Sequence, residues 1–394
     1  MIQKILHTPE GVRDIYNEEC ERKLALEGGL RQVLNSYGYR DIETPTFEFF
    51  DVFSREVGTI PSRELYKFFD REGNTLVLRP DFTPSIARAA SKYFMNEQEP
   101  IRLCYLGNTF VNNSSYQGRL KESTQMGAEL IGDSTPEADA EIIAMAADCL
   151  QRAGLEEFQI SVGHVQFFAS LAKEAGLDED TEEELKQLIV NKNNFGVEKL
   201  LSETSMDPGL RDIFIALPSL FGGEEVLERA CEMTRGREAS RAIARLREVL
   251  ELLKIYRMDR YVSFDLGMLG NYMYYTGVVF RGYTYGVGDA LIKGGRYDNL
   301  LGHFGKESPA IGFVVVMNQL MNALARQKVE ILSEQGRYLI LYRKKDRQEA
   351  IRKAMDYRRQ GKRAELRLIT EEQDMEDQAA RAAKSYIGII RIGE

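Results

Sequence analysis

Residues 101–132 constrain the fold more than any other stretch, because their apolar and polar side chains alternate with the period of a β-strand. The pattern predicts two strands joined by the polar loop 112–118. In the second strand alternate residues lie on opposite faces, with Met126, Ala128 and Leu130 on one and Gln125, Gly127 and Glu129 on the other. Gln125 and Glu129 are about 13 Å apart along a strand, and Gly127 leaves room for a small ligand between them. A half-buried strand with a solvated polar face explains the same pattern.

Composition narrows the class of protein. A chain of 394 residues is long enough for two or three domains, one of them with a substantial core. The net charge of −9 argues against a protein whose main partner is a nucleic-acid backbone. The four cysteines are widely spaced and the three histidines form no ligand pair, so we expect a reducing compartment and no structural zinc. We find no signal peptide and no apolar run near 18 residues, so we expect a cytoplasmic protein. We also expect no cofactor.

The order of hydrophobic periods predicts an α+β protein in three parts. Strand and helix patterns alternate over residues 1–327, except for residues 178–257, where only helical periods occur. We interpret this stretch as a helical insertion that serves packing. Residues 337–394 predict a small α/β domain with 15 Lys and Arg against 10 Asp and Glu. This basic excess hints at an RNA partner, although a solvated helix face explains it equally well.

Two turns carry candidate ligand contacts. Thr83 is a favourable N-cap with Pro84 at the first helical position, so Asp81 is expected on a short strand-to-helix connection. Polar groups in such connections often meet ligands, although Asp81 would equally suit bonds to the amides of its own turn. Gly294 and Gly295 permit a close approach of another group, but no nucleotide-loop fingerprint occurs in the chain.

Several segments, in order along the chain, resemble the motifs of the histidyl-tRNA synthetase family. They are Thr8–Asp14, Glu43–Phe47, Leu78–Thr83, Tyr105–Gly132, Tyr274–Gly277 and Gly294–Asp298. The resemblance covers essentially the whole chain. It implies a class II aminoacyl-tRNA synthetase-like antiparallel sheet flanked by helices over residues 1–327, with the helical insertion, and a truncated anticodon-binding-like α/β domain over residues 337–394.

The segment Glu43–Phe47 resembles the first class II motif, which builds a dimer interface in that family. Pro45 cannot donate a hydrogen bond to a β-ladder, so an edge or interface position suits it. We therefore expect a dimer with this segment at its interface.

Three departures from the family concern the handling of ATP. Continuous alignment places Val111, Gly270 and Gln319 where the family has arginines that hold the triphosphate. Arginine suits that task because its planar fork is always charged. The loss of one comparable donor costs roughly 3–4 kcal/mol of transition-state stabilisation, so three losses leave little expectation of amino-acid activation.

The histidine pocket of the family is retained. The resemblance assigns histidine binding to Asp81, Thr83, Gln125, Glu129, Tyr274 and Tyr275. An acid with a phenol suits an imidazole, because both ring nitrogens can donate when the ring is charged.

A chain that binds histidine but does not use ATP resembles the regulatory subunits of ATP phosphoribosyltransferase, the first enzyme of histidine biosynthesis. That resemblance implies a non-catalytic subunit, a hetero-octamer with a short catalytic subunit, feedback inhibition by histidine, and no tRNA partner. Many members keep an arginine where Val111 stands, so we assign no role to the loop 112–117. Two alternatives are a working histidyl-tRNA synthetase whose arginines come from elsewhere, and a free-standing histidine- or RNA-binding module.

Overall fold

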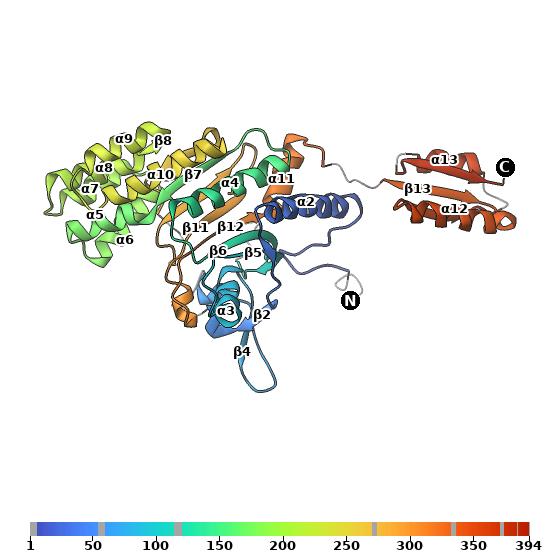
Figure 1. Ribbon diagram of the computed structural model, residues 1–394, viewed down its shortest axis with the longest axis horizontal. Coiled ribbons are helices and arrows are strands. Elements are labelled where there is room, and N and C mark those ends of the chain that lie inside the picture. Colours follow the sequence, from blue (N-terminus) through green and yellow to red (C-terminus); the bar gives the residue numbers. More distant parts are fainter. Residues whose placement is uncertain are drawn as a thin grey trace. The chain divides into compact units, whose positions relative to one another are not determined.

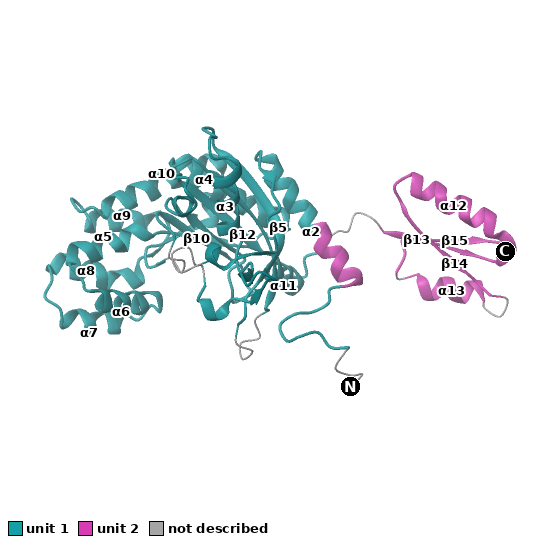
Figure 2. Cartoon of the chain, turned by 90° about the horizontal axis from the view of Figure 1, so that it is seen from below, with its two compact units in different colours: residues 1–15, 26–330 teal, residues 16–25, 331–394 magenta. Residues whose placement is uncertain are grey.

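The computed structural model divides the chain into two compact units. Unit 1 comprises residues 1–15 and 26–330, and unit 2 comprises residues 16–25 and 331–394 (Figure 2). Helix α2 (Asn17–Ser36) contributes residues to both. The structure describes residues 6–53, 60–113, 120–269, 274–331, 336–370, 374–383 and 385–393.

A nine-stranded sheet forms the centre of unit 1 (Figure 1). In spatial order its strands are β1 (Arg40–Asp41), β5 (Ile101–Phe110), β6 (Glu122–Ile131), β12 (Ala310–Val316), β11 (Ile292–Arg296), β10 (Val278–Tyr283), β7 (Gln159–His164), β9 (Val262–Asp265) and β8 (Phe221–Gly222). The six strands from β5 to β7 pair antiparallel throughout. The expected antiparallel sheet is therefore confirmed, and short strands extend it at both edges.

The predicted pair of strands at residues 101–132 is confirmed as β5 and β6, with Tyr105 opposite Gly127. The apolar face of β6 lies on the side covered by α4 (Pro136–Arg152), which contacts β6 and β12. Thr135 caps α4, because its hydroxyl accepts a hydrogen bond from the amide of Ala138 at 3.3 Å. The other face of the sheet meets α3 (Thr83–Tyr93) through a buried cluster that includes Tyr105. This second face carries the site.

Helices fill most of the stretch that the sequence predicts to be helical. They are α6 (Glu179–Val190), α7 (Asn194–Ser202), α8 (Pro208–Ala216), α9 (Glu224–Met233) and α10 (Ser240–Tyr256), and α5 (Val165–Ala175) precedes the stretch. The stretch also contains β8, which pairs with β9 and which the sequence did not predict. Two residues are too short to show a strand period, so the pattern gave no signal there.

A small antiparallel sheet lies beside α3 in unit 1, with β4 (Thr75–Leu78) between β2 (Phe47–Phe49) and β3 (Lys67–Phe69). Strands β3 and β4 are consecutive in the chain and pair antiparallel as a hairpin. Glu48 is buried in β2, and its carboxylate lies 2.7 Å from the guanidinium of Arg88 in α3. This partly buried ion pair links the small sheet to the helix that follows the turn of Asp81.

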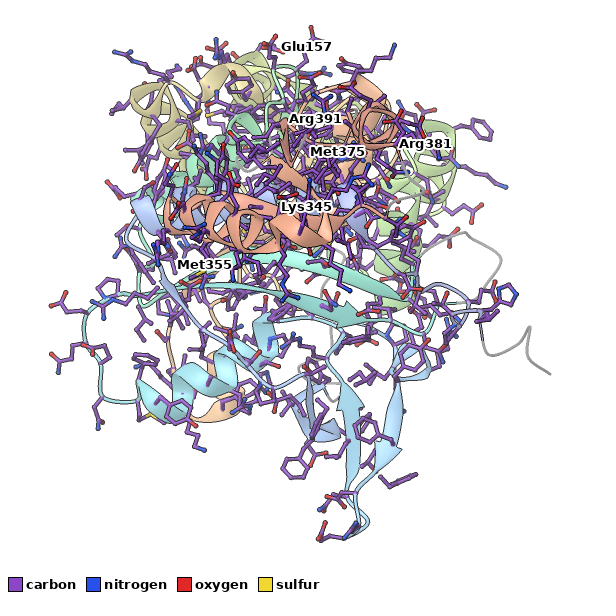
Figure 3. The ribbon with its side chains drawn as sticks, turned by 90° about the vertical axis from the view of Figure 1, so that its right-hand side faces the viewer. Glu157, Lys345, Met355, Met375, Arg381 and Arg391 are labelled. Atoms are coloured by element: carbon purple, nitrogen blue, oxygen red, sulfur yellow. The ribbon has the colours of Figure 1, made fainter. Side chains whose placement is uncertain are left out.

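In unit 2 a parallel sheet is formed by β14 (Arg363–Leu368), β13 (Arg337–Tyr342) and β15 (Gly388–Ile392). Helices α12 (Arg347–Arg359) and α13 (Met375–Ala382) bury alternate sides of β13, as the alternating clusters around Ile340 and Leu341 show. Figure 3 labels Met355 of α12, which is 45% exposed, and Met375 of α13, which is 5% exposed. Unit 1 ends with α11 (Met317–Gln327). Across the described residues, every helix is too short or too polar to span a membrane.

Candidate functional site

The floor of the site is set by the register of β6 against β12. Glu129 lies directly opposite Gly312. A β-carbon at position 312 would lie 1.7 Å from Oε2 of Glu129, so only glycine leaves space for the carboxyl group. The strand pairing therefore fixes where this carboxyl lies before any ligand arrives.

Glu129 is enclosed and hydrogen-bonded on both oxygens. Thr83 donates from its hydroxyl to Oε1 at 2.8 Å, and Tyr297 donates to Oε2 at 2.6 Å. The side chain is 1% exposed. Burial raises the pKa of Glu129 to about 8, although the two hydroxyl donors act in the opposite direction. Near pH 7 the group holds a proton that it can share with a ligand.

Asp81 lies at the same cavity and keeps contacts with its own turn. Its Oδ1 accepts a hydrogen bond from the amide of Thr83 at 3.3 Å, and its Oδ2 accepts one from the hydroxyl of Tyr274 at 3.3 Å. Burial raises the pKa of Asp81, while Lys293 favours the charged form. The expected bond to an amide of its own turn is confirmed, and a ligand contact of Asp81 stays a prediction.

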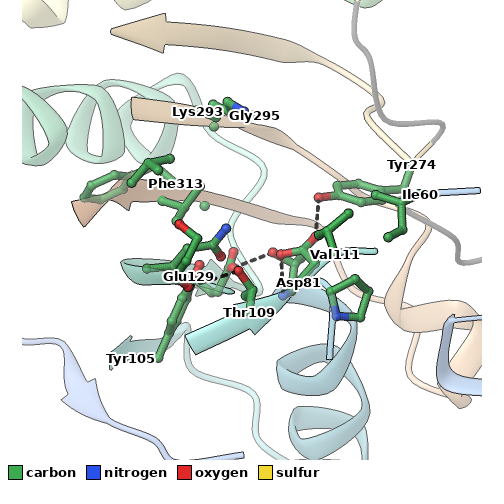
Figure 4. Close-up of a pocket in the computed structure, with 18 of the residues that line it drawn as sticks. Ile60, Asp81, Tyr105, Thr109, Val111, Glu129, Tyr274, Lys293, Gly295 and Phe313 are labelled. Atoms are coloured by element: carbon green, nitrogen blue, oxygen red, sulfur yellow. Dashed lines mark hydrogen bonds between the residues drawn. The ribbon is translucent and has the colours of Figure 1, made fainter. Parts of the chain in front are cut away.

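The six residues predicted from sequence meet at one cavity of about 200 Å³ (Figure 4). They are Asp81, Thr83, Gln125, Glu129, Tyr274 and Tyr275. Oε1 of Gln125 is buried and has no hydrogen-bond partner in the described part of the chain. A buried acceptor without a donor is costly, so a donor from a bound ligand would stabilise it.

Two local predictions are wrong. The face of β6 that carries Gly127 and Glu129 is buried rather than solvated. The space beside Gly127 is not open either, because a β-carbon there would lie 2.5 Å from the hydroxyl of Tyr105. The register places Tyr105 opposite the glycine, and its side chain occupies the gap.

Thr83 is not the N-cap of its helix. Helix α3 begins at Thr83, and the N-cap residue is Phe82, which makes no side-chain cap bond. The hydroxyl of Thr83 instead donates to Glu129. A tertiary acceptor thus competes with the local capping preference, which sequence patterns alone do not reveal.

Sequence reasoning missed the partners of Glu129. Tyr297 belongs to the segment Gly294–Asp298, which was identified as a motif without a role for its tyrosine. Gly312 lies in a strand, where an isolated glycine often marks the close approach of another group. The predicted close approach at Gly295 is confirmed, since a β-carbon there would lie 2.7 Å from the ring of Tyr275.

Two of the three positions where the family has arginines for the triphosphate lie next to this cavity. Val111 and Gln319 line a neighbouring cavity of about 980 Å³. The amide of Gln319 donates to Asp289 at 3.1 Å, so it is engaged within the chain. Gly270 lies outside the described residues. In the described ranges, no cluster of His, Cys, Asp and Glu side chains is suited to hold a metal ion.

Known proteins resemble the chain in both sequence and fold. The family model for histidyl-tRNA synthetase matches residues 11–320. An ATP phosphoribosyltransferase regulatory subunit of Acetivibrio thermocellus is 43% identical over 361 residues, which is 92% of this chain and 86% of that protein. One from Ruminiclostridium cellulolyticum is 41% identical over 387 residues, 98% of this chain and 92% of the relative.

Solved structures of related proteins also resemble the chain. A structure described as an ATP phosphoribosyltransferase regulatory subunit/histidyl-tRNA synthetase from Bacillus halodurans is 33% identical, with a TM-score of 0.86 over 99% of both chains. The histidyl-tRNA synthetase of Nostoc is 19% identical, with a TM-score of 0.81 over 97% of this chain and 91% of that one, which shows the shared fold. The chain therefore belongs to the family of ATP phosphoribosyltransferase regulatory subunits, which has the histidyl-tRNA synthetase fold.

Proposed function

We propose that this chain is a non-catalytic regulatory subunit of ATP phosphoribosyltransferase, required for the first step of histidine biosynthesis, and that it senses histidine in the cavity of Glu129. The names of its relatives support the regulatory role. Sensing of histidine rests on the chemistry of the cavity. Feedback inhibition follows if histidine binds the inhibited state of the assembled enzyme better than the active state, by a coupling of roughly 1–3 kcal/mol.

One observation carries the histidine proposal: the carboxyl of Glu129 is fixed by Thr83 and Tyr297 at a cavity that Asp81 also lines. Histidine offers an ammonium group and an imidazole, both of which donate hydrogen bonds. The unpartnered Oε1 of Gln125 supplies a further acceptor. The cavity therefore offers acceptors from Asp81, Gln125 and Glu129 to a ligand that presents N–H groups.

The proposal that the chain is not catalytic rests on missing positive charges at the positions that hold ATP in a synthetase. Val111 and Gln319 are neutral where a synthetase needs cations for the triphosphate, and the sequence adds Gly270. A triphosphate of several negative charges is stabilised by the whole set of arginines rather than by any one of them.

The expected assembly follows from the family. We propose a hetero-octamer with a short catalytic subunit, built from dimers of this chain, in the cytoplasm and without tRNA. Residues 1–327 would form the synthetase-like core and residues 337–394 an anticodon-binding-like domain.

Calorimetric titration tests the sensing role. Histidine is titrated into the complete complex with wild-type chain and with Glu129→Gln, and inhibition of the phosphoribosyltransferase reaction is measured in parallel. Weaker binding together with weaker inhibition in the variant is expected. Unchanged binding and inhibition in an intact variant complex would move the histidine site elsewhere, most simply to the boundary with the catalytic subunit.

Pyrophosphate exchange tests the absence of catalysis. Wild-type chain is incubated with histidine, ATP and labelled pyrophosphate, and no exchange into ATP is expected. Histidine-dependent exchange would instead support the alternative of a working synthetase.

A further inference from the structure

The segment that carries Tyr274 and Tyr275 is attached to the end of β11 by the residue that follows them, Thr276. The amide of Thr276 donates a hydrogen bond to the backbone oxygen of Arg296 at 2.8 Å. Its hydroxyl accepts one from the amide of Asp298 at 2.9 Å and donates a longer one to the oxygen of Arg296 at 3.4 Å. One residue therefore binds this segment at two positions near the end of the strand.

The two positions lie on either side of Tyr297, whose hydroxyl donates to Glu129. The strand end is itself fixed, because the side chain of Arg296 is buried and lies 2.7 Å from Asp139 in α4. Thr276 thus relates the segment of the two tyrosines to the same short stretch that holds the carboxyl of Glu129.

On its other side the segment is bound by the start of α5. The amide of Val165 donates to the oxygen of Gly277 at 3.0 Å, and the side-chain amide of Gln166 donates to the oxygen of Thr276 at 3.2 Å. These bonds use main-chain oxygens, so any residue at positions 276 and 277 can accept them. The hydroxyl of Thr276 differs, because its bonds depend on the identity of the residue.

The position of this segment decides where two rings of the cavity lie. The ring of Tyr275 packs against Gly295, where a β-carbon would lie 2.7 Å from it. The hydroxyl of Tyr274 donates to Asp81 at 3.3 Å (Figure 4). Both tyrosines line the cavity, whereas Thr276 does not. A shift at Thr276 would therefore move two lining side chains without removing any of them.

We propose that Thr276 is a positioning residue of the histidine site, whose hydroxyl holds Tyr274 and Tyr275 in place relative to Glu129. The inference rests on the proposed function, since it assigns a role in the binding of histidine. Thr276 acts through the two tyrosines and does not contact the ligand. Side chains that are held in place lose less conformational freedom when a ligand binds, so the hydroxyl contributes to affinity from outside the cavity.

Two substitutions at this position test the role of the hydroxyl. Thr276→Val keeps the branched shape but removes the acceptor for the amide of Asp298 and the donor to Arg296. In calorimetric titration of the complete complex, histidine affinity should fall about 3- to 10-fold, the value of one neutral hydrogen bond. Thr276→Ser keeps the hydroxyl and should bind histidine like wild type. A thermal melt checks that each variant is folded.

Thr284 provides a matched control in the same unit. Its hydroxyl also donates to a backbone oxygen, that of Glu157 at 2.5 Å, and it accepts a hydrogen bond from the side chain of Gln327 at 3.0 Å. Thr284 lines neither of the two cavities. Thr284→Val therefore makes the same chemical change away from the site and should leave histidine affinity unchanged.

A double substitution separates positioning from a general loss of stability. Tyr275→Phe removes a hydroxyl group from a residue that lines the cavity. Thr276→Val should weaken histidine binding less in the Tyr275→Phe background than in wild type, because part of its effect acts through that hydroxyl. Residues that act through one another give such non-additive effects, whereas independent effects add.

The outcomes distinguish this inference from the proposed function. Absence of histidine binding by the wild-type complex would overturn both. Where the wild-type complex binds histidine, wild-type affinity of Thr276→Val would overturn the positioning role alone. An equal loss of affinity in Thr276→Ser or in Thr284→Val would do the same, as would an equal effect of Thr276→Val in the Tyr275→Phe background.

Discussion

Tyr297 donates a hydrogen bond from its hydroxyl to Oε2 of Glu129 at 2.6 Å, across 168 positions of sequence. Both side chains are buried, at 2% and 1% exposure. With Thr83 on the other oxygen, the carboxyl of Glu129 cannot rotate freely. Because this protein side chain is already fixed, it loses little conformational entropy when a ligand binds. The arrangement therefore favours affinity as well as specificity.

The first prediction concerns the affinity for histidine. Glu129→Gln keeps the size of the side chain but removes the negative charge that a bound cationic ligand would induce by lowering the pKa of Glu129. Histidine affinity should therefore fall roughly 10- to 150-fold, the value of a hydrogen bond to a charged group. Glutamine is preferred over alanine, because alanine would leave the hydroxyls of Thr83 and Tyr297 buried without an acceptor. Calorimetry measures the affinity, and a thermal melt checks the fold.

The control for this substitution is Glu184→Gln on the exposed surface of α6, which should bind histidine like wild type. Equal affinity of Glu129→Gln and wild type would show that the carboxyl does not contact the ligand.

The second prediction concerns stability against pH. The folded state raises the pKa of Glu129 from 4.5 to about 8 by burial, so between these values it keeps a proton that the unfolded chain releases. The free energy of unfolding should therefore fall as pH rises through this window, by at most about 1.4 kcal/mol per pH unit for one group. Asp81 acts with the same sign, because burial raises its pKa as well.

The effect of His164 on the pH dependence of unfolding has the opposite sign, and it determines the pH range in which the carboxyl groups can be tested. Burial, with Arg245 and Arg296 nearby, lowers the pKa of His164 from 6.5 to about 4, so its contribution is lost only as pH falls below 6.5. Urea unfolding between pH 6.5 and 8 thus isolates the carboxyl groups. Wild-type chain should lose stability across this range, and Glu129→Gln should lose less. A variant with the wild-type slope would contradict the assignment to Glu129.

The third prediction concerns a buried ion network behind the site. Asp139 is fully buried in α4, with Oδ1 2.7 Å from Arg296 of β11 and Oδ2 2.7 Å from Arg245 of α10. Asp139→Ala should destabilise the chain by about 3–5 kcal/mol, because Arg296 would stay buried with only the partly exposed Asp298 as an ionic partner. Chemical denaturation measures the change.

An exposed pair provides the comparison for Asp139. Glu238 lies 3.6 Å from Arg241 with both side chains largely exposed, so Glu238→Ala should cost no more than about 1 kcal/mol. Similar losses for the two variants would mean that the Asp139 network does not stabilise the fold.

The network also reaches the site, since the backbone oxygen of Arg296 accepts a hydrogen bond from the amide of Thr276, next to Tyr275.

Sequence reasoning succeeded where the signal was local. The alternation along β6 gave the correct pair of strands and the correct sharing of faces by Gln125 and Glu129. It failed where the outcome depended on distant segments. A solvated polar face was one of the two interpretations of the pattern, but α3 and the segment of Tyr274 cover this face, and neither is adjacent to β6 in the sequence.

The hydroxyl of Thr83 illustrates the same limit. Its local pattern favours a helix cap, yet the structure gives it to Glu129, 46 residues away. The six site residues were brought together by resemblance to a family, since no period or spacing relates Asp81 to Tyr274. The bond of Tyr297 to Glu129 was missed, because a tyrosine inside a glycine motif gives no sign of which acceptor it meets.

The last prediction concerns self-association. One face of the small sheet exposes Phe47, Phe49 and Phe68, at 51%, 56% and 37%, beside the segment of Pro45 that the sequence predicts at a dimer interface. An exposed aromatic face of this kind is typical of a protein interface. Wild-type chain should therefore sediment as a dimer at micromolar concentration, and Phe47→Ser combined with Phe68→Ser should sediment as a monomer. Each buried phenylalanine contributes roughly 1.5–3 kcal/mol and counts twice in a two-fold dimer, so the dissociation constant should rise at least about a thousandfold.

Phe195→Ser, at a 77% exposed position on α7, should leave the dimer intact. A wild-type monomer would refute the dimer, and a double variant that stays dimeric would place the interface on another surface.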